Sequence, residues 1–118
     1  IPGIAFSSAS LTDPQFTRFS PYVAPIIQYA THVHPIPTGT LLNVTFPHAD
    51  TLDTHHDGAV AGIKFTRQGK SYIHAPNDAD GDTYWVQQGY ITIVPVYVAE
   101  LTHRTYLERA QRIPLEHA

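Results

Sequence analysis

Four short segments of the chain carry the apolar patterns that are typical of β-strands. Apolar and β-branched residues run almost without a break through residues 4–7, 41–46 and 90–98, which predicts strands covered on both faces. Residues 62–67 instead alternate apolar and polar side chains, which predicts a strand with one exposed face. Pro95 cannot donate a hydrogen bond to a neighbouring strand, so we expect residues 90–98 to end, bulge or lie at a sheet edge there.

Two further segments show the residue spacing of a helix with one apolar face. The first has its apolar positions at Val23, Ile26, Ile27, Ala30 and Val33. Residues 35–39, with two prolines and a glycine, end this helix. The second lies near the end of the chain, where we expect Thr102 to cap a helix with an apolar stripe of Tyr106, Leu107, Ala110 and Ile113. A capping side chain followed by proline predicts earlier helix starts at Asp13-Pro14 and Ser20-Pro21.

A cap, a helical turn and a stop precede the last predicted strand. We expect the Asp82 carboxylate to accept hydrogen bonds at the start of a short helix over residues 83–88. Gly89 is expected to end that helix in the left-handed conformation. The polar residues 48–58 predict a loop, and residues 71–75 predict a weak strand that pairs with residues 62–67 as an exposed ribbon.

The order of these elements indicates an α/β protein, because strands and helices alternate along the chain. Apolar residues make up 42% of the 118 residues and charged residues 14%, which is the composition of a globular chain. The length allows one domain at most. We therefore expect residues 1–118 to form a single α/β domain or part of one.

Charge and composition exclude several classes of function. The net charge is −3 and the basic residues do not cluster as they do on a nucleic-acid surface. The absence of cysteine excludes a disulfide framework and a zinc–thiolate site. No apolar run reaches the length of about eighteen residues that a membrane span needs, and no leader precedes the first strand, so we expect a soluble, cytoplasmic protein. The chain starts at Ile1 on an apolar run without an initiator Met, which indicates a part of something longer.

The histidines raise the hypothesis of a metal site. Four candidate ligands lie close together in the predicted loop: Asp53, His55, His56 and Asp57. The further candidates are His32 and His34 or His48. The spacing argues against this site, because adjacent histidines do not easily face one ion and no helical HxxxH pair is present. Residues 78–82 have the acidic alternation of a calcium loop, but Thr83 and Gly89 stand where an EF-hand needs Gly and Glu. A solvated loop and a turn leading to a helix cap are the alternative interpretations.

Polar residues follow two of the predicted strands. In open α/β sheets, ligands bind beyond the carboxyl ends of the strands. Ser7, Ser8 and His48 lie at two such ends, and with Asn43 they are our candidates for lining a substrate pocket; local caps are the alternative interpretation. The sequence has no GxSxG nucleophile motif. Lys64, Arg67 and Lys70 form a small basic group that either meets a phosphate or simply faces solvent.

Four sequence motifs resemble, in order, the second half of the survival protein SurE family. They are IPGIAFS at residues 1–7, GTLLNVTFP at 39–47, GIKFTRQGK at 62–70 and GDTYWVQQGYITIVPV at 81–96. Members of this family are metal-dependent nucleotidases that remove phosphate from nucleoside monophosphates. The resemblance implies a Rossmann-like α/β domain with a β-hairpin and a C-terminal helix that assemble a homo-oligomer, a dimer or a tetramer.

The resemblance also implies that the metal ligands are not in this chain. In the family, the divalent metal, Mg or Mn, is held by an adjacent Asp pair, a Ser and an Asn, all of which precede the first of the four motifs and so lie upstream of Ile1. We therefore expect no metal ligand here, and no activity from the 118-residue chain alone. The chain departs from the family at Thr45, which stands in place of an Asn, at Trp85, and in the short segment between Lys70 and Asp82.

Three functions follow from these observations. The first is the C-terminal part of a SurE-like metal-dependent phosphomonoesterase that acts on nucleoside monophosphates. The second is an α/β assembly or binding module without catalysis. The third is a metal-binding protein that uses His55 and His56.

Overall fold

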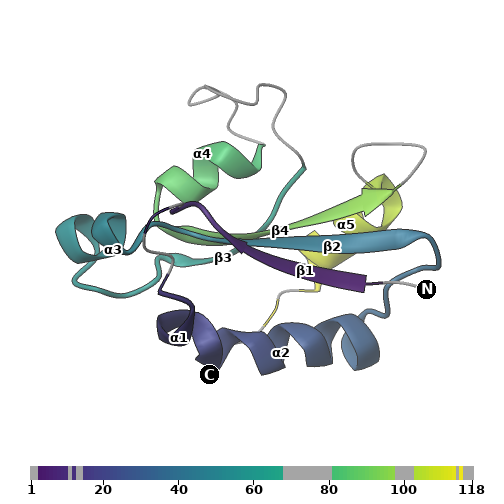
Figure 1. Ribbon diagram of the computed structural model, residues 1–118. Coiled ribbons are helices and arrows are strands. Elements are labelled where there is room, and N and C mark those ends of the chain that lie inside the picture. The colour runs from purple at the N-terminus through teal and green to yellow at the C-terminus, as the bar shows by residue number, and fades with distance from the viewer. Residues whose placement is uncertain are drawn as a thin grey trace.

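The computed structural model describes residues 3–10, 12, 15–67, 81–97, 103–113 and 115. Its centre is a four-stranded sheet in the order β1-β2-β4-β3 (Figure 1). The strands are β1 (Gly3–Ser8), β2 (Thr40–Phe46), β3 (Gly62–Phe65) and β4 (Tyr90–Tyr97). The pairs β1–β2 and β3–β4 are parallel, whereas β2 and β4 meet antiparallel in the middle. The mixed sheet with its helices confirms the α/β class and is consistent with a Rossmann-like fold.

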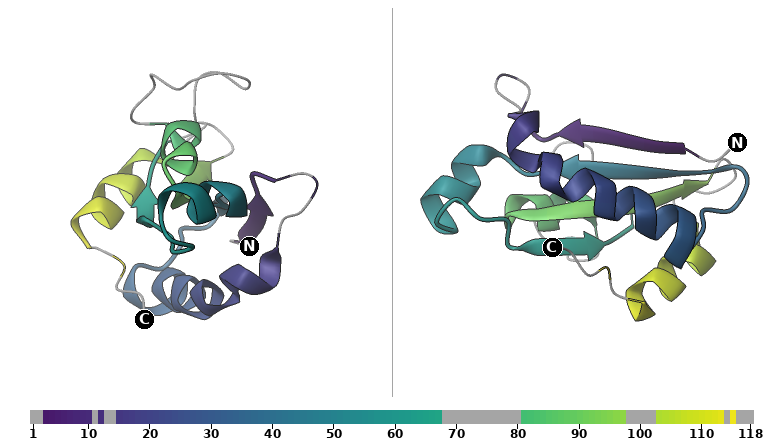
Figure 2. Two further views of the ribbon diagram at one scale, coloured as in Figure 1. Left: turned by 90° about the vertical axis from the view of Figure 1, so that its left-hand side faces the viewer. Right: turned by 90° about the horizontal axis from the view of Figure 1, so that it is seen from below.

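Helices cover both faces of the sheet. The segment between β1 and β2 consists of α1 (Phe16–Phe19), the 3₁₀ turn η1 (Ser20–Tyr22), α2 (Val23–Gln28) and the π-helical turn η2 (Tyr29–Val33). It crosses one face, here called the lower face (Figure 2). The opposite, upper face carries α4 (Asp82–Gln87) (Figure 1). The remaining helices are α3 (Ala49–His55), which follows β2, and α5 (Arg104–Arg112).

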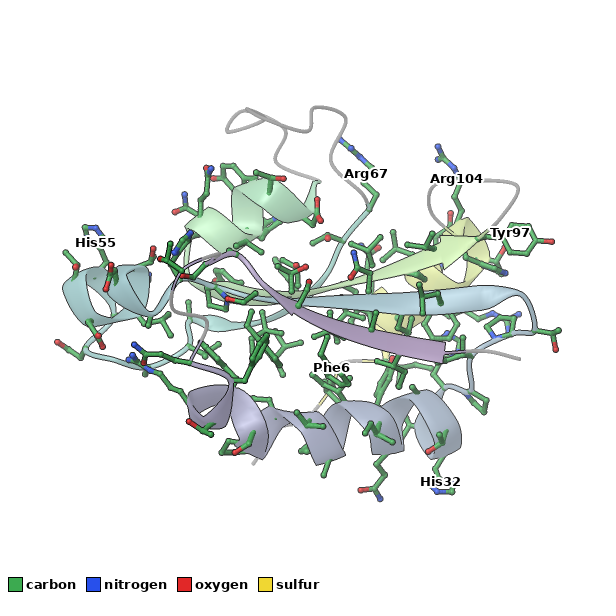
Figure 3. All side chains as sticks on the ribbon, in the orientation of Figure 1. Phe6, His32, His55, Arg67, Tyr97 and Arg104 are labelled. Carbon is green, nitrogen blue, oxygen red and sulfur yellow. The ribbon has the colours of Figure 1, made fainter. Side chains whose placement is uncertain are left out.

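The hydrophobic core lies between the lower face and the helices below it. Alternate residues of a strand point to opposite faces. The residues of β2 and β4 that point down are buried together with residues of α1, α2 and η2: Leu42, Val44, Phe46, Ile91 and Ile93 with Phe19, Ile26, Tyr29 and Ala30. Phe6 of β1 also points toward the helices (Figure 3) and packs against this core. The apolar runs of the sequence therefore locate these strands correctly, but of the three only β4 is buried on both faces, because β1 and β2 have exposed residues on the upper face.

Pro95 lies in β4, between β2 and β3 in the strand order, but β3 ends before it, so β4 forms a local sheet edge at Pro95, which is one of the predicted alternatives. Pro95 pairs with Leu42 of β2, and β4 continues to Tyr97. The carbonyl of Pro95 accepts a hydrogen bond from the His103 N–H at 2.7 Å, so its backbone groups face away from β2. On that side β3 pairs with β4 only as far as Ile93. The N–H that proline lacks thus falls beyond the end of β3.

The predicted apolar stripe of the first helix is only partly buried. Ile26 and Ala30 are in the core, but Ile27 is 41% exposed and Val33 is 53% exposed. Ile27 lies within α2 and lines an apolar groove. For Val33 the reason is that the α-helix ends at Gln28 and continues as a π-helical turn. A π-helix has a wider turn than the α-helix, so the spacing of 3.6 residues no longer keeps the later positions on one face.

Residues 48–58 contain a helix, so their prediction as a loop is wrong. Helix α3 spans Ala49–His55, and Ala49 and Leu52, three residues apart, are both buried. After the helix, Asp57 has φ 53 and Gly58 has φ 80, which turns the chain toward β3. Two buried residues in a polar segment are too weak a periodic signal to distinguish a short helix from a loop.

The end of α4 agrees with the prediction, but its start does not, because the helix begins at Asp82 and its cap is Gly81 instead of Asp82. The Asp82 carboxylate lies in the first turn and accepts a hydrogen bond from the Thr83 N–H at 2.9 Å. Gly89 has φ 89, as expected for the residue that ends the helix in the left-handed conformation. The acidic segment therefore supplies a carboxylate to the first turn of a helix, and residues 78–80 lie outside the described residues.

Helix α5 buries Tyr106, Leu107 and Ala110 as predicted, whereas Ile113 is 40% exposed. Its cap is His103, whose Nδ1 accepts a hydrogen bond from the Tyr106 N–H at 3.2 Å. The Tyr106 hydroxyl donates to the His34 carbonyl at 2.7 Å and joins α5 to the end of η2.

Several sequence predictions concern positions outside the described residues. They are the predictions for Ile1, Asp13-Pro14, Lys70, the strand at 71–75 and Thr102. In the described segments, helices are too short or too polar to cross a membrane.

Candidate functional site

The carboxyl ends of β1 and β2 lie side by side. The parallel register pairs Ser7 with Thr45 and Ser8 with Phe46, and the Ala9 N–H donates to the Phe46 carbonyl at 2.9 Å. Ser7 and Ser8 on β1 and His48 just after β2 are therefore brought to one edge of the sheet. This is the position at which open α/β sheets bind ligands.

Ser7 and Asn43 share the upper face. Ser7 is exposed, and its Oγ lies 3.4 Å from the Val44 carbonyl oxygen and 3.5 Å from Thr45 Oγ1. Asn43 is half-buried and pairs with Ala5 on one side and Val94 on the other. Asn43 and Thr45 are alternate residues of β2, so they point the same way as Ser7. A hydroxyl pair and an amide thus face the same side of the sheet.

Ser8 and His48 have local structural roles. The Ser8 hydroxyl accepts a hydrogen bond from the Ser10 N–H at 3.0 Å, which makes a tight turn after β1. His48 is exposed and precedes α3 in an extended conformation, and its side chain does not cap the helix. Its backbone carbonyl accepts from the Leu52 N–H at 3.4 Å. These two candidates shape the edge, whereas Ser7 and Asn43 present polar groups above it.

The histidines of the metal hypothesis do not come together. His55 on α3 and His32 on η2 point into solvent at opposite ends of the molecule (Figure 3). The His34 ring instead stacks on Tyr106 with 3.8 Å between ring centroids. The described segments contain no group of three or more His, Asp or Glu side chains that could hold a metal ion. Mg²⁺ and Mn²⁺ need carboxylate oxygens, so the described side chains do not fit a divalent-metal site.

The family resemblance implies metal ligands in a different part of the protein. The resemblance places them upstream of Ile1, and Ile1 itself lies outside the described residues. That placement therefore stays a prediction.

Asp53, another residue of the histidine-loop hypothesis, forms an ion pair. The Arg18 guanidinium of α1 contacts the two Asp53 carboxylate oxygens at 2.5 and 3.3 Å and donates to the Gly58 carbonyl at 3.0 Å. The hydrogen bond from Arg18 holds the pKa of the Asp53 carboxyl below its usual value. This contact fixes α1, α3 and the turn after α3 against one another, next to the end of β2.

The ion pair predicts a pH dependence of stability. A depressed folded-state pKa stabilises the protein above the unfolded pKa of about 3.9, and this contribution disappears as the pH falls through the folded-state value. We expect Asp53→Asn to lower the urea midpoint slightly at neutral pH, because the pair is partly exposed. The difference from wild type should vanish at acidic pH. Urea titrations of both proteins over a pH series measure it, and a difference that does not change with pH contradicts the role of this ion pair.

An apolar groove of about 490 Å³ lies on the opposite side of β1, between this strand and α2. Its lining consists of apolar residues and one threonine: Gly3, Ile4, Phe6, Ile27, Ala30, Thr31, Pro35 and Ile36. None of these side chains titrates or binds a metal. The groove therefore has no groups for phosphoryl chemistry, and the polar edge and upper face remain the candidate site.

Sequence reasoning missed Thr45 as a site residue. The alternation within β2 indicates that Asn43 and Thr45 share one face, but the side of the sheet follows only from the pairing with β1. That register is a long-range property, and a single sequence does not reveal it.

Two curated proteins are similar to most of this chain. The 5'-nucleotidase SurE of Protochlamydia amoebophila (strain UWE25) is 28% identical over 131 residues, which cover 91% of this chain and 48% of that protein. The 5'-nucleotidase SurE of Crocosphaera subtropica (strain ATCC 51142 / BH68) is 32% identical over 128 residues, which cover 81% of this chain and 44% of that protein. No protein-family model matches the chain. The chain spans about half the length of these curated relatives, and the two matches with the α/β fold identify it as a SurE-like C-terminal part.

Proposed function

We propose that the protein to which this chain belongs is a metal-dependent phosphomonoesterase that hydrolyses nucleoside monophosphates. The observation that carries this proposal is the similarity to two proteins named 5'-nucleotidase SurE over 91% and 81% of the chain. Residues 1–118 form the C-terminal portion of its single α/β domain. The protein works in the cytoplasm as a homo-oligomer, a dimer or a tetramer, with Mg or Mn bound by residues upstream of Ile1.

In this proposal the carboxyl edge of β1 and β2 supplies part of the pocket wall. The Ser7 hydroxyl is exposed and the Asn43 amide is half-buried on the same face, so both are able to donate hydrogen bonds to phosphate or sugar oxygens. The Ser8 turn and the start of α3 after His48 hold the two strand ends in place. The carboxylates that a divalent metal requires are not among these groups, which fits a supporting role for this half of the protein.

Phosphate release from nucleoside monophosphates tests the proposal. The full-length protein should release inorganic phosphate with Mg or Mn present, and EDTA should abolish the release. The isolated 118-residue chain should release none, because it lacks the metal ligands. A full-length protein that binds metal and releases no phosphate overturns the proposed function. Strong metal-dependent release by the isolated chain, with its mass verified, overturns the placement of the ligands outside it.

A further inference from the structure

Each strand of the sheet contributes one polar side chain to a single row on the upper face. The strand registers pair Ser7 with Thr45, Thr45 with Thr92, and Thr92 with Lys64. Residues paired directly across neighbouring strands point to the same face. The four side chains therefore run from one edge of the sheet to the other, and we call them the polar row. It holds three hydroxyls and one ammonium group, which are groups that bind an oxyanion. It holds no carboxylate, which would repel one.

The row is open to solvent at Ser7 and covered at Thr92. Ser7 is exposed and Thr45 is half-buried, and their hydroxyl oxygens lie 3.5 Å apart. Thr92 is fully buried on β4, the strand below α4 (Figure 1). A small group that approaches over β1 and β2 therefore meets the Ser7 and Thr45 hydroxyls first. It then lies next to the covered end of the row.

Thr92 is one of three threonines among the described residues with a buried hydroxyl that lacks a partner, and it is the one that lies in the row. Its side chain is 0% exposed, and its Oγ1 has no hydrogen-bond partner. A buried hydroxyl without a partner destabilises a fold, so such groups are uncommon and need an explanation. Its cross-strand partners are Thr45 of β2 and Lys64 of β3. An oxyanion bound among them would accept the hydrogen bond that Thr92 is unable to make within the protein.

Lys64 supplies a positive charge that is already positioned. Its Nζ lies 4.3 Å from the centroid of the Trp85 ring and 6.0 Å from that of Tyr90. The two rings meet edge to face at 5.1 Å, so they hold the ammonium group from α4 and β4 together. Carboxylates of the described residues form no ion pair with Lys64. A cation held by aromatic rings keeps N–H groups for an anion, which a cation in a salt bridge does not.

We propose that the polar row binds a phosphate group above Thr92, with Lys64 as the counter-charge, the Thr45 and Thr92 hydroxyls as hydrogen-bond donors, and Ser7 at the open end. The identity of this group as the phosphate of a nucleoside monophosphate rests on the proposed function. Binding of a phosphate group by the row does not depend on the proposed function. Of the three basic residues noted in the sequence, Lys64 belongs to the row, whereas Arg67 points away from the sheet (Figure 3).

Two substitutions in the full-length protein test the row. Thr92→Val removes the hydroxyl and keeps the shape of the side chain, and Lys64→Met removes the charge and keeps the length. We expect each to weaken binding of inorganic phosphate by about tenfold or more, because hydrogen bonds to charged groups are the stronger ones. Isothermal titration calorimetry with inorganic phosphate gives the affinity, and the KM for nucleoside monophosphates should rise in parallel.

Thr40 provides a matched control for Thr92. It is also buried, at 2% exposed, and its Oγ1 also lacks a partner, but it lies on the lower face with Leu42 and Val44. Thr40→Val and Thr92→Val both remove an unpartnered hydroxyl, so both should raise the thermal unfolding midpoint. Only Thr92→Val should weaken phosphate binding. This contrast separates an effect on the ligand from an effect on folding.

The outcomes of these experiments test the phosphate-binding role of the polar row and the proposed function separately. Unchanged phosphate affinity in folded Thr92→Val and Lys64→Met proteins overturns the row, even where the wild type hydrolyses nucleoside monophosphates. Equal losses in Thr40→Val and Thr92→Val overturn it as well. Selective loss of phosphate binding in the row variants of a protein that hydrolyses no nucleotide supports the row and overturns the proposed function.

Discussion

Replacing Phe46 by alanine is expected to lower the free energy of unfolding by about 3–5 kcal/mol. Phe46 is 2% exposed, and its ring stacks on Phe19 with 4.8 Å between centroids and 5° between planes. The Phe6 ring stacks on it from β1 at 5.9 Å. Truncation would leave a cavity where strand and helix meet, and the aromatic rings around it are unable to fill the space without leaving their own contacts. Urea unfolding monitored by circular dichroism measures the loss.

Phe16 provides the control for this substitution. It also contacts Phe46, edge-on at 6.3 Å, but it is 49% exposed. Phe16→Ala should cost well under half as much as Phe46→Ala, because less apolar surface is buried there. Equal costs for the two substitutions would show that the stacking of Phe46 on Phe19 does not organise this part of the core.

The Phe46 substitution should also affect the candidate site. Phe46 is the last residue of β2, it pairs with Ser8, and its carbonyl accepts the Ala9 N–H. Loss of its packing frees the strand end that holds the Ser8 turn and the start of α3. We therefore expect activity of the full-length protein to fall together with stability, and phosphate binding to weaken even though no group of the polar row is changed.

Local patterns of the sequence predicted the strands well because runs of apolar and β-branched residues are a local signal. The apolar runs at 41–46 and 90–98 overlap β2 and β4, and Gly89 ends α4 as expected, whereas Asp82 lies one position inside the helix instead of capping it. The segment 48–58 was predicted wrongly because α3 depends on distant partners. Its Leu52 is buried in the core and its Asp53 binds Arg18 of α1, and neither contact is visible in the local sequence.

The polar row of the candidate site also depends on contacts between distant parts of the chain, which the local sequence does not reveal. Ser7, Thr45, Thr92 and Lys64 lie on four different strands, and each residue alone has the appearance of an ordinary polar strand residue. Their alignment depends on a parallel pair at each edge and an antiparallel pair in the centre. Sequence motifs located the carboxyl edge correctly, but the strand order decides which hydroxyls share a face. Pro95 is the clearest example, since its place in a central strand follows only from the early end of β3.

Gly89→Ala is the second substitution with a large expected effect on folding. Gly89 has φ 89, a left-handed conformation that costs a residue with a side chain about 1–3 kcal/mol. A Cβ placed there would lie 2.7 Å from His56 Cδ2 and 2.8 Å from His56 Nε2, so the His56 ring must move as well. Both effects act at the turn that joins α4 to β4. We expect the urea midpoint of Gly89→Ala to fall by more than the backbone cost alone explains.

A double-mutant cycle with His56→Ala separates the two contributions. In the His56→Ala background the ring is gone, so Gly89→Ala should retain the backbone cost and lose the steric one. The coupling between the two substitutions should therefore be favourable, with the double mutant more stable than the sum of the single effects. Gly89→Asn is a further check, because asparagine tolerates the left-handed region better than alanine. If His56→Ala restored full stability to Gly89→Ala, the backbone strain would be negligible and crowding against α3 would be the whole reason for glycine at this turn.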